Sequence, residues 1–351
     1  MKLIDLRSDT VTKPSAGMRE ALAQAEVGEE LYREDTTVNE LQQRSAEVLG
    51  HEACLFVPSG TMGNLIALRA HTSPGDEVIF ESRAHIYNNE MGGFAAVCGL
   101  VARPVPGDAD GMLSWHLVRQ SIRPVHRAAT RLVCVENTHA FAGGRVLPQP
   151  EVDALCDNLR SFGIACHLDG ARLGNASQAS GKSLAELARP FDSVMFDFSK
   201  GLGSPAGAVV AGTEEFIGRA RRVRKLLGGE IHQPGIMAGA CLYGLLHHLP
   251  KLQNDHKSAR RLAEGLKQIA GIVIDTDCVA TNIVLFRLEQ HLDMACFLSE
   301  LRKRQVLAST LEDGSLRFVT HLDIDDSDID VAISAVGGAI NAIGAFSSVS
   351  K

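Results

Sequence analysis

The sequence predicts an α/β protein: a large part with a mainly parallel sheet wrapped by helices, followed by a small C-terminal α+β part. Two observations support this prediction. Apolar runs of strand length alternate with helical patterns through the first two thirds of the chain, as is typical of parallel sheets covered on both faces. Near residue 250 this alternation stops. We therefore expect the large part over residues 1–250 and the small part over residues 251–351.

Six apolar runs in the large part have the length and composition of buried strands. They span residues 53–57, 77–80, 132–135, 164–168, 194–198 and 208–211. A capping box formed by Thr37 and Glu40 predicts the start of a helix, and Gly50 predicts its end. Another helical stretch, residues 62–71, follows Ser59-Gly60-Thr61.

The small part shows a different sequence of signals. A polar helix is expected over residues 255–269, strands over 272–274 and 282–286, and a further helix over 293–304. A hairpin is expected from residues 306–312 and 315–321, because Asp313-Gly314 is a favoured turn dipeptide. These elements together predict an α+β arrangement.

Composition restricts the functional class. The 351 residues are 45% hydrophobic and 22% charged, with a net charge of −7 and a pI near 6.0, which opposes nucleic acid and acidic membranes as partners. The basic cluster at residues 219–225 is interpreted as a solvated helix face, of which one or two members could meet a phosphate. The eight cysteines form no Cys-x-x-Cys pair and are interpreted as small buried hydrophobes. Charges in the first nine residues oppose a signal peptide, so we expect a cytoplasmic protein.

Two short polar runs point to pyridoxal phosphate chemistry. Asp169 and Lys200 each follow a predicted buried strand, and the lysine comes 31 residues after the acid. The carboxyl ends of parallel strands meet at one sheet edge, where α/β proteins bind ligands. A lysine amine can hold the cofactor aldehyde, and a carboxylate opposite the pyridine nitrogen keeps that nitrogen protonated. Taken singly, either residue is more often a solvated side chain or a turn.

Other residues have two interpretations each. Ser59, Gly60 and Thr61 suit either a phosphate cradle at a helix start or a plain N-cap. His85 is either a structural histidine or a ring that stacks on the cofactor and moves a proton. Arg317 lies inside a predicted strand, where an arginine needs a partner, so with Arg172 it is a candidate for binding a carboxylate.

With these residues in hand, the chain resembles the low-specificity L-threonine aldolases, a family of pyridoxal-phosphate enzymes of fold type I. The likeness runs nearly from end to end. It rests on the segments DLRSDTVT at 5–12, FVPSGTM at 56–62, AHIY at 84–87, ENTH at 136–139, LDGAR at 168–172 and SKGLG at 199–203.

The resemblance implies a role for each matching residue. Lys200 would hold the cofactor, Asp169 would pair with the pyridine nitrogen, and His85 would stack on the ring. The phosphate would be held by Ser59, Gly60 and Thr61, the substrate carboxylate by Ser8, Arg172 and Arg317, and His126 would lie near the β-hydroxyl. The implied reaction is retro-aldol cleavage of L-threonine or L-allo-threonine to glycine and an aldehyde, without a metal. The family also implies a homodimer or homotetramer with sites between subunits.

The chain departs from the family pattern at three loops. Arg33 and Thr36 replace a usual glycine and proline. The run Gly229-Glu230-Ile231-His232-Gln233 stands where the family has Gly-Gly-Met-Arg-Gln, so a permanent charge near the cofactor is lost at His232. The run His139-Ala140-Phe141 lacks the family's usual asparagine after the histidine, and its Phe141 either favours a larger or aromatic substrate side chain or is loop drift.

Two other functional classes stay open at this point. The same cofactor geometry supports β-elimination, racemisation or transamination of another amino acid. A protein of this fold could also bind the cofactor as a sensor without catalysis, although the presence of Lys200, Asp169 and His85 opposes that reading.

Overall fold

The main sheet has the predicted, mostly parallel topology. The computed structural model describes residues 2–124 and 126–349. Over these residues, seven strands form the sheet in the order β2-β8-β7-β6-β5-β3-β4, and every neighbouring pair is parallel except those that include β8. The strands are β2 (Ala53–Val57), β3 (Glu77–Glu81), β4 (Val101–Val105), β5 (Thr130–Glu136), β6 (Ala165–Gly170), β7 (Ser193–Asp197) and β8 (Ala208–Gly212).

All six predicted strands of this sheet are present, and their ends fall within two residues of the prediction. The seventh strand, β4, was not predicted. It lies at the sheet edge, contains Arg103 and Pro104, and has only Val105 buried. An edge strand exposed in this way lacks the continuous apolar run that identifies its neighbours.

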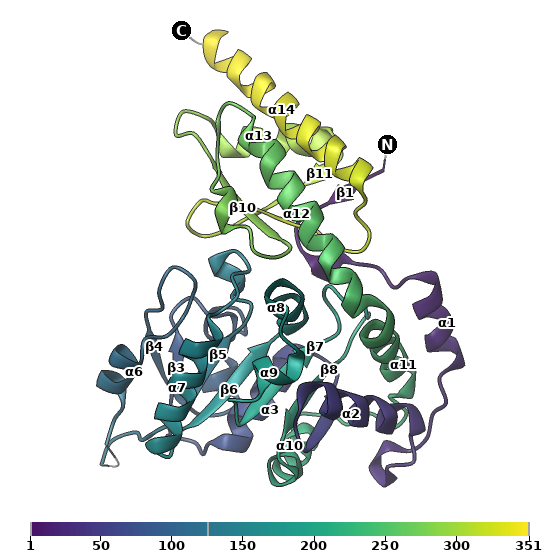
Figure 1. Cartoon of the computed structure of the whole chain (residues 1–351), viewed down its shortest axis with the longest axis vertical. Helices are drawn as coiled ribbons and strands as arrows, with labels where there is room; N and C mark the ends of the chain where they lie inside the picture. Colours follow the sequence, from purple (N-terminus) through teal and green to yellow (C-terminus); the bar gives the residue numbers. More distant parts are fainter. Residues whose placement is uncertain (1, 125, 350–351) are drawn as a thin grey trace.

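Helices cover both faces of the sheet, as Figure 1 shows. One face packs against α3 (Gly60–His71), α5 (Gly93–Ala96) and α10 (Glu214–Leu226). The other packs against α2 (Thr36–Leu49), α6 (Trp115–Ser121), α7 (Gln149–Ser161), α8 (Leu173–Ser180), α9 (Leu184–Ala188) and α11 (Gly235–Tyr243). Along β2, Phe56 joins one core while Leu55 and Val57 join the other, the alternation expected of a strand buried on both faces.

The start of α2 differs from the prediction. Asp35, not Thr37, is the N-cap, because its Oδ1 accepts the backbone N–H of Val38 at 3.0 Å. The capping box is therefore wrong, since an aspartate two residues before Thr37 already accepts the N–H of Val38. The helix does end at Gly50, whose φ of 68° is in the left-handed region that glycine adopts freely.

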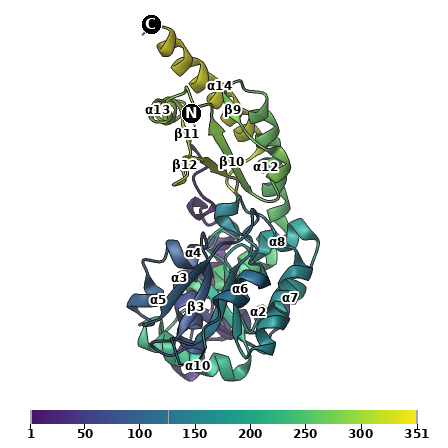
Figure 2. The ribbon, with the colours of Figure 1, turned by 90° about the vertical axis from the view of Figure 1, so that its left-hand side faces the viewer.

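The C-terminal residues form a second sheet at one end of the main sheet (Figure 1, Figure 2). Its order is β12 (Ser309–Thr310), β13 (Leu316–Val319), β10 (Ile283–Leu288) and β9 (Ile272–Val273), all antiparallel. It packs with α12 (Leu252–Lys267), α13 (Met294–Lys303) and α14 (Asp326–Val349). The remaining helices include α1 (Ala16–Gln24), α4 (His85–Asn88), η1 (Asp9–Val11), η2 (Glu30–Tyr32) and η3 (Ala140–Ala142).

The predicted hairpin is only partly correct. Its first half divides, because β11 (Val306–Leu307) pairs in parallel with β1 (Ile4–Asp5) and only β12 pairs with β13. The turn is present, with Gly314 at a φ of 77°. The N-terminal strand therefore packs with the C-terminal sheet, and the division at residue 250 stays a prediction.

Two composition-based interpretations need correction. Cys278 and Cys296 are exposed, although the other cysteines are buried and all eight are unpaired. In the basic cluster on α10, Arg224 is only 2% exposed, pairs with Glu30 at 2.6 Å and donates to the carbonyl of Phe56 at 2.9 Å, so it does not belong to a solvated face. Among the described residues, no helix combines the length and apolar character needed to span a bilayer.

Candidate active site

The sheet brings Asp169, Lys200, His85 and the start of α3 to one edge. Asp169 is the next-to-last residue of β6, and Lys200 follows β7, which runs parallel to β6. The strand β2 has the same direction as β7, since both are antiparallel to β8, so α3 begins at this edge too. His85 begins α4 after β3. We call this the carboxyl edge of the sheet.

Asp169 is buried and held by two donors. It is 1% exposed, its Oδ2 accepts the Nδ2–H of Asn64 at 2.9 Å, and its Oδ1 accepts the backbone N–H of Ala171 at 3.1 Å. A carboxylate has about four acceptor positions, so it can take a further N–H. That capacity suits the pyridine nitrogen of the predicted cofactor.

His85 is coupled to a second buried acid, Glu90. The Nδ1 of His85 lies 3.2 Å from Glu90 Oε1, and its backbone N–H donates to Glu136 at 2.7 Å. The hydrogen bond to Glu90 raises the pKa of His85 against the lowering effect of burial, and Asp169 adds to the rise. Burial, together with the charge of Asp169, raises the pKa of Glu90. The pair can therefore share a proton at the carboxyl edge.

Asn64 joins these two acids. Its Nδ2 donates to Glu90 Oε1 and to Asp169 Oδ2, both at 2.9 Å. Ligand atoms of His85, Glu90 and Asp169 lie within 4.8 Å of one another, a spacing that a metal ion could use. Because an amide N–H points at both carboxylates, the cluster is better satisfied by hydrogen bonds than by a cation.

Lys200 and Arg172 lie beside a buried aspartate, Asp9. The Lys200 side chain is 17% exposed, and its Nζ is 3.8 Å from Asp197. Arg172 forms a two-pronged ion pair with Asp9, at 2.7 Å from Nε and 2.6 Å from Nη2. Burial would raise the pKa of Asp9, but the charge and hydrogen bonds of Arg172, with the charge of Lys200, lower it well below its usual range.

The other candidates for binding the substrate carboxylate lie nearby. Arg317 in β13 donates to Ser309 Oγ at 3.2 Å and to the carbonyl of Arg7 at 3.2 Å. Burial lowers its pKa, and the charge of Arg172 adds to this. Ser8 is the N-cap of η1, next to Asp9. Two guanidinium groups thus face one region, an arrangement that favours binding of an anionic group between them.

The start of α3 fits a phosphate. Ser59 is the N-cap, and its Oγ accepts the N–H of Met62 at 3.3 Å. Gly60 and Thr61 form the first turn, where helix amides lack intrahelical partners. The N-cap interpretation of Ser59 is therefore confirmed, and because an N-cap serine leaves the next amides available, the phosphate cradle stays a prediction. The donor set fits pyridoxal phosphate: a lysine amine, a carboxylate with a free acceptor position, a ring and a helix start.

His126 lies elsewhere. It is exposed in the loop before β5, and the first residue of that strand, Thr130, donates to Glu77 at the start of β3. This is the amino edge of the sheet, opposite Asp169. Within one chain the structure does not bring His126 to the other candidates, and its role stays a prediction.

Sequence reasoning missed three residues of the site. Asn64 is a buried polar residue in the otherwise apolar middle of α3, and Glu90 follows His85 by five residues. Asp9 stands inside the segment that carries the resemblance. The polar interruption at Asn64 was the detectable signal, whereas the pairing of Arg172 with Asp9, 163 residues apart, required the fold.

Comparisons with known proteins point to one family. The family model described as beta-eliminating lyase matches residues 5–289. Low-specificity L-threonine aldolase 1 of Arabidopsis thaliana is 40% identical over 341 residues, covering 95% of each chain. Low specificity L-threonine aldolase of Escherichia coli strain K12 is 41% identical over 324 residues, covering 92% of this chain and 95% of the relative.

Solved structures show the same fold. A structure of Leishmania major threonine aldolase has a TM-score of 0.81 at 21% identity, covering 95% of this chain and 98% of its own. The predicted fold type I architecture is thereby confirmed. Fold and family match together define a pyridoxal-phosphate-dependent lyase of the beta-eliminating class. Within that class, the chain belongs to the low-specificity L-threonine aldolase family.

Proposed function

We propose that this protein cleaves L-threonine, L-allo-threonine and related L-β-hydroxy-α-amino acids to glycine and an aldehyde, with pyridoxal phosphate as cofactor. The observation that carries the proposal is the meeting of Asp169, Lys200, His85 and the Arg172 and Arg317 pair at one sheet edge. The relatives named above, at about 40% identity over most of the chain, support it.

Each part of the cofactor has a candidate residue. Lys200 would attach it, Asp169 would accept the N–H of its ring, and His85 would cover one face of the ring. The phosphate would accept the amides and hydroxyls of Ser59, Gly60 and Thr61. When bound, pyridoxal phosphate supplies an electron sink for the electron pair released as the Cα–Cβ bond breaks.

The two arginines would orient the substrate. A guanidinium group binds a carboxylate with two parallel hydrogen bonds, which fixes direction as well as position. Arg172 is already held by Asp9 on its Nε side, so only part of its fork is available to the substrate. Arg317 and Ser8 complete the carboxylate site. Fixing the carboxylate sets the rotation about the bond between the amino nitrogen and Cα, and with it the direction of the Cα–Cβ bond relative to the electron sink.

The β-hydroxyl must lose a proton for the bond to break. His85 is the candidate that this chain places at the carboxyl edge, and Glu90 behind it strengthens its basicity. An ordered water is a second route. His126 is exposed at the opposite edge, so we assign it to the site of a neighbouring subunit, where the family resemblance puts it near the β-hydroxyl.

Assembly and location complete the proposal. We infer a homodimer or homotetramer with sites between subunits, and a cytoplasmic location. Large apolar side chains left exposed support an assembly, among them Met91 at 95% and Tyr32 at 70%. Eight unpaired cysteines agree with a reducing compartment. Light scattering of the purified protein measures the assembly, and a monomer would contradict that part.

Product identity tests the reaction. The loaded enzyme is incubated with L-threonine, and glycine, acetaldehyde, ammonia and keto acid are measured. Glycine with acetaldehyde supports aldol cleavage. Ammonia with a keto acid would instead indicate β-elimination, and a cofactor absorbance that no amino acid perturbs would indicate a sensor.

A further inference from the structure

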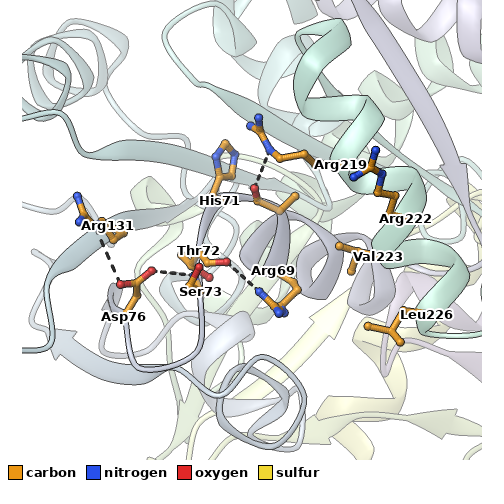
Figure 3. Close-up of a pocket in the computed structure, with 11 residues that line it drawn as sticks. Arg69, His71, Thr72, Ser73, Asp76, Arg131, Arg219, Arg222, Val223 and Leu226 are labelled. Carbon is orange, nitrogen blue, oxygen red and sulfur yellow. Dashed lines mark hydrogen bonds and ion pairs between the residues drawn. The ribbon is translucent and has the colours of Figure 1, made fainter.

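A cleft lined by arginines lies on the α3 and α10 side of the amino edge, away from the candidate active site. Its volume is about 800 Å³, within the roughly 300–1,000 Å³ typical of small-molecule sites. Arg219 and Arg222 reach it from α10, Arg69 from α3, and Arg131 from β5 (Figure 3). Arg219 and Arg222 belong to the basic cluster at residues 219–225, and the active site uses none of the four arginines.

The charges of this cleft are unbalanced. Asp76 is the one carboxylate among the lining residues, and it lies 4.0 Å from Arg131. Arg219 pairs with Glu215 on its own helix and donates to the carbonyl of Ala70 at 3.0 Å. Within the described part of the chain, Arg222 has no hydrogen bond or ion pair. In a protein with a net charge of −7, this excess of positive charge is local and concave.

A hydrogen-bonded chain leads from this cleft to the active site. His71, which lines the cleft, has Nε2 at 2.8 Å from Ser193 Oγ, and that oxygen is 2.8 Å from Nδ1 of His167. Nε2 of His167 is 3.1 Å from Asn64 Oδ1. Asn64 then donates to Asp169 and Glu90. We call these four residues, His71, Ser193, His167 and Asn64, the relay.

Secondary structure explains why the relay lines up. Asn64 and His71 are seven residues, about two turns, apart on α3 and share one helix face. His167 and Asp169 are two residues apart on β6 and share one sheet face. Ser193 is opposite His167 in the register of β6 and β7. One helix face lying on one sheet face therefore produces the whole chain of contacts.

All hydrogen bonds of the relay donate in one direction, from His71 toward Asp169 and Glu90. Carboxylates only accept, so the Asn64 amide must turn its N–H groups to Asp169 and Glu90 and its oxygen to His167. His167 must then donate from Nε2. Burial, together with the charge of His71, lowers the pKa of His167 to about 3, so its neutral ring accepts at Nδ1 from the Ser193 hydroxyl. The Ser193 oxygen in turn accepts the Nε2–H of His71.

His71 is the end of the relay that a ligand can reach. Burial lowers its pKa to about 4, with Asp192 opposing the shift and Arg219 adding to it. Its ring stacks on Phe216 at 4.6 Å, and its Nδ1 has no partner among the described residues. A phosphate oxygen beside this ring would favour the protonated imidazole. A charged His71 would strengthen each donation toward Asp169.

We propose that the arginine cleft is a second binding site, for a small anion that bears phosphate groups, and that the relay transmits its occupancy to Asp169. Guanidinium groups bind phosphate oxygens in pairs, and four of them surround the cleft. The inference goes beyond the proposed function, because binding at this site does not depend on which amino acid is cleaved.

Calorimetry on the cofactor-loaded enzyme tests the site. Inorganic pyrophosphate and a nucleoside diphosphate are the two probes, and the tighter one distinguishes an inorganic from an organic source. Arg219→Ala/Arg222→Ala should weaken binding by about tenfold or more. Arg302→Ala, an exposed arginine on α13, is the matched control and should change nothing. No binding of either probe, or equal binding to the double variant, would overturn the proposal.

The cofactor absorbance spectrum tests the relay. Saturating probe should change the spectrum of the wild-type enzyme, because Asp169 would accept the N–H of the cofactor ring in the proposed function. Ser193→Ala and His71→Gln interrupt the relay from its middle and its outer end. Ser193→Ala, which lies outside the cleft, should keep binding within about twofold, and both variants should lose the spectral change. A spectral change that persists in both variants would overturn the link to Asp169.

Discussion

Replacing Glu90 by glutamine tests whether the acid behind His85 sets its basicity. Glu90 is 5% exposed, and its Oε1 contacts both His85 Nδ1 and Asn64 Nδ2. Glutamine has the same shape, so the contact to Asn64 can persist through the side-chain oxygen. What is lost is the negative charge that raises the pKa of His85.

The size of the effect follows from that hydrogen bond. A hydrogen bond to a charged group contributes about 1.5–3 kcal/mol, and each 1.4 kcal/mol changes a rate about tenfold. We therefore expect Glu90→Gln to lower kcat by about tenfold to hundredfold. The pKa of His85 is raised in the wild type, so kcat increases as pH rises through it. Without the charge, the acid limb of the kcat profile should move to lower pH.

Glu81→Gln is the matched control. Glu81 is also a buried acid hydrogen-bonded to a histidine, with His139 Nε2 at 2.8 Å, but it lies outside the candidate site. The Glu81→Gln variant should have a lower free energy of unfolding, while its pH profile of kcat stays the same as in the wild type. Steady-state cleavage of L-threonine between pH 5 and 9 measures both variants. If Glu90→Gln retains the wild-type kcat and acid limb, Glu90 does not act through His85.

Three further predictions address other parts of the site. Asp9→Asn leaves the buried Arg172 unpaired and should cost about 3–5 kcal/mol in the free energy of unfolding, measured with denaturant; a loss below about 1 kcal/mol would contradict the pairing. Lys200→Ala should abolish both turnover and the visible absorbance of the attached cofactor, and continued turnover would remove the lysine from its role. His232→Arg should tighten cofactor binding, measured by equilibrium dialysis, because it restores a permanent charge in a side chain that is 84% exposed and has its Nδ1 at 3.0 Å from Glu29. Unchanged affinity would show that this position does not contact the cofactor.

The central sheet could be predicted because its strands are buried on both faces. Five-residue runs such as β2 and β8 are apolar throughout, and that pattern depends only on local sequence. The strand β4 was not predicted because it lies at an edge of the sheet and has only Val105 buried. Residues 306–312 are divided between β11 and β12 because β11 pairs with β1, which is some 300 residues away in sequence. No local sequence pattern could predict this division.

The same distinction between local patterns and long-range contacts explains which site residues could be predicted. Asp169 and Lys200 follow apolar strands, and a carboxylate and a lysine amine are the groups that pyridoxal phosphate needs. Their residue types and positions therefore suggested a role. Glu90 and Asn64 act through contacts with residues on other elements, and a side chain that serves a neighbour has no motif of its own. The relay from His71 could be found only once the register of β6 and β7 was known.

The most direct test of the account is the stoichiometry of products from L-threonine and L-allo-threonine with the purified, cofactor-loaded protein. The account predicts glycine and acetaldehyde in equal amounts from at least one of the two, and the ratio of the two rates then gives the preference at Cβ. No cleavage of either, with the cofactor visibly bound, would contradict the proposed reaction.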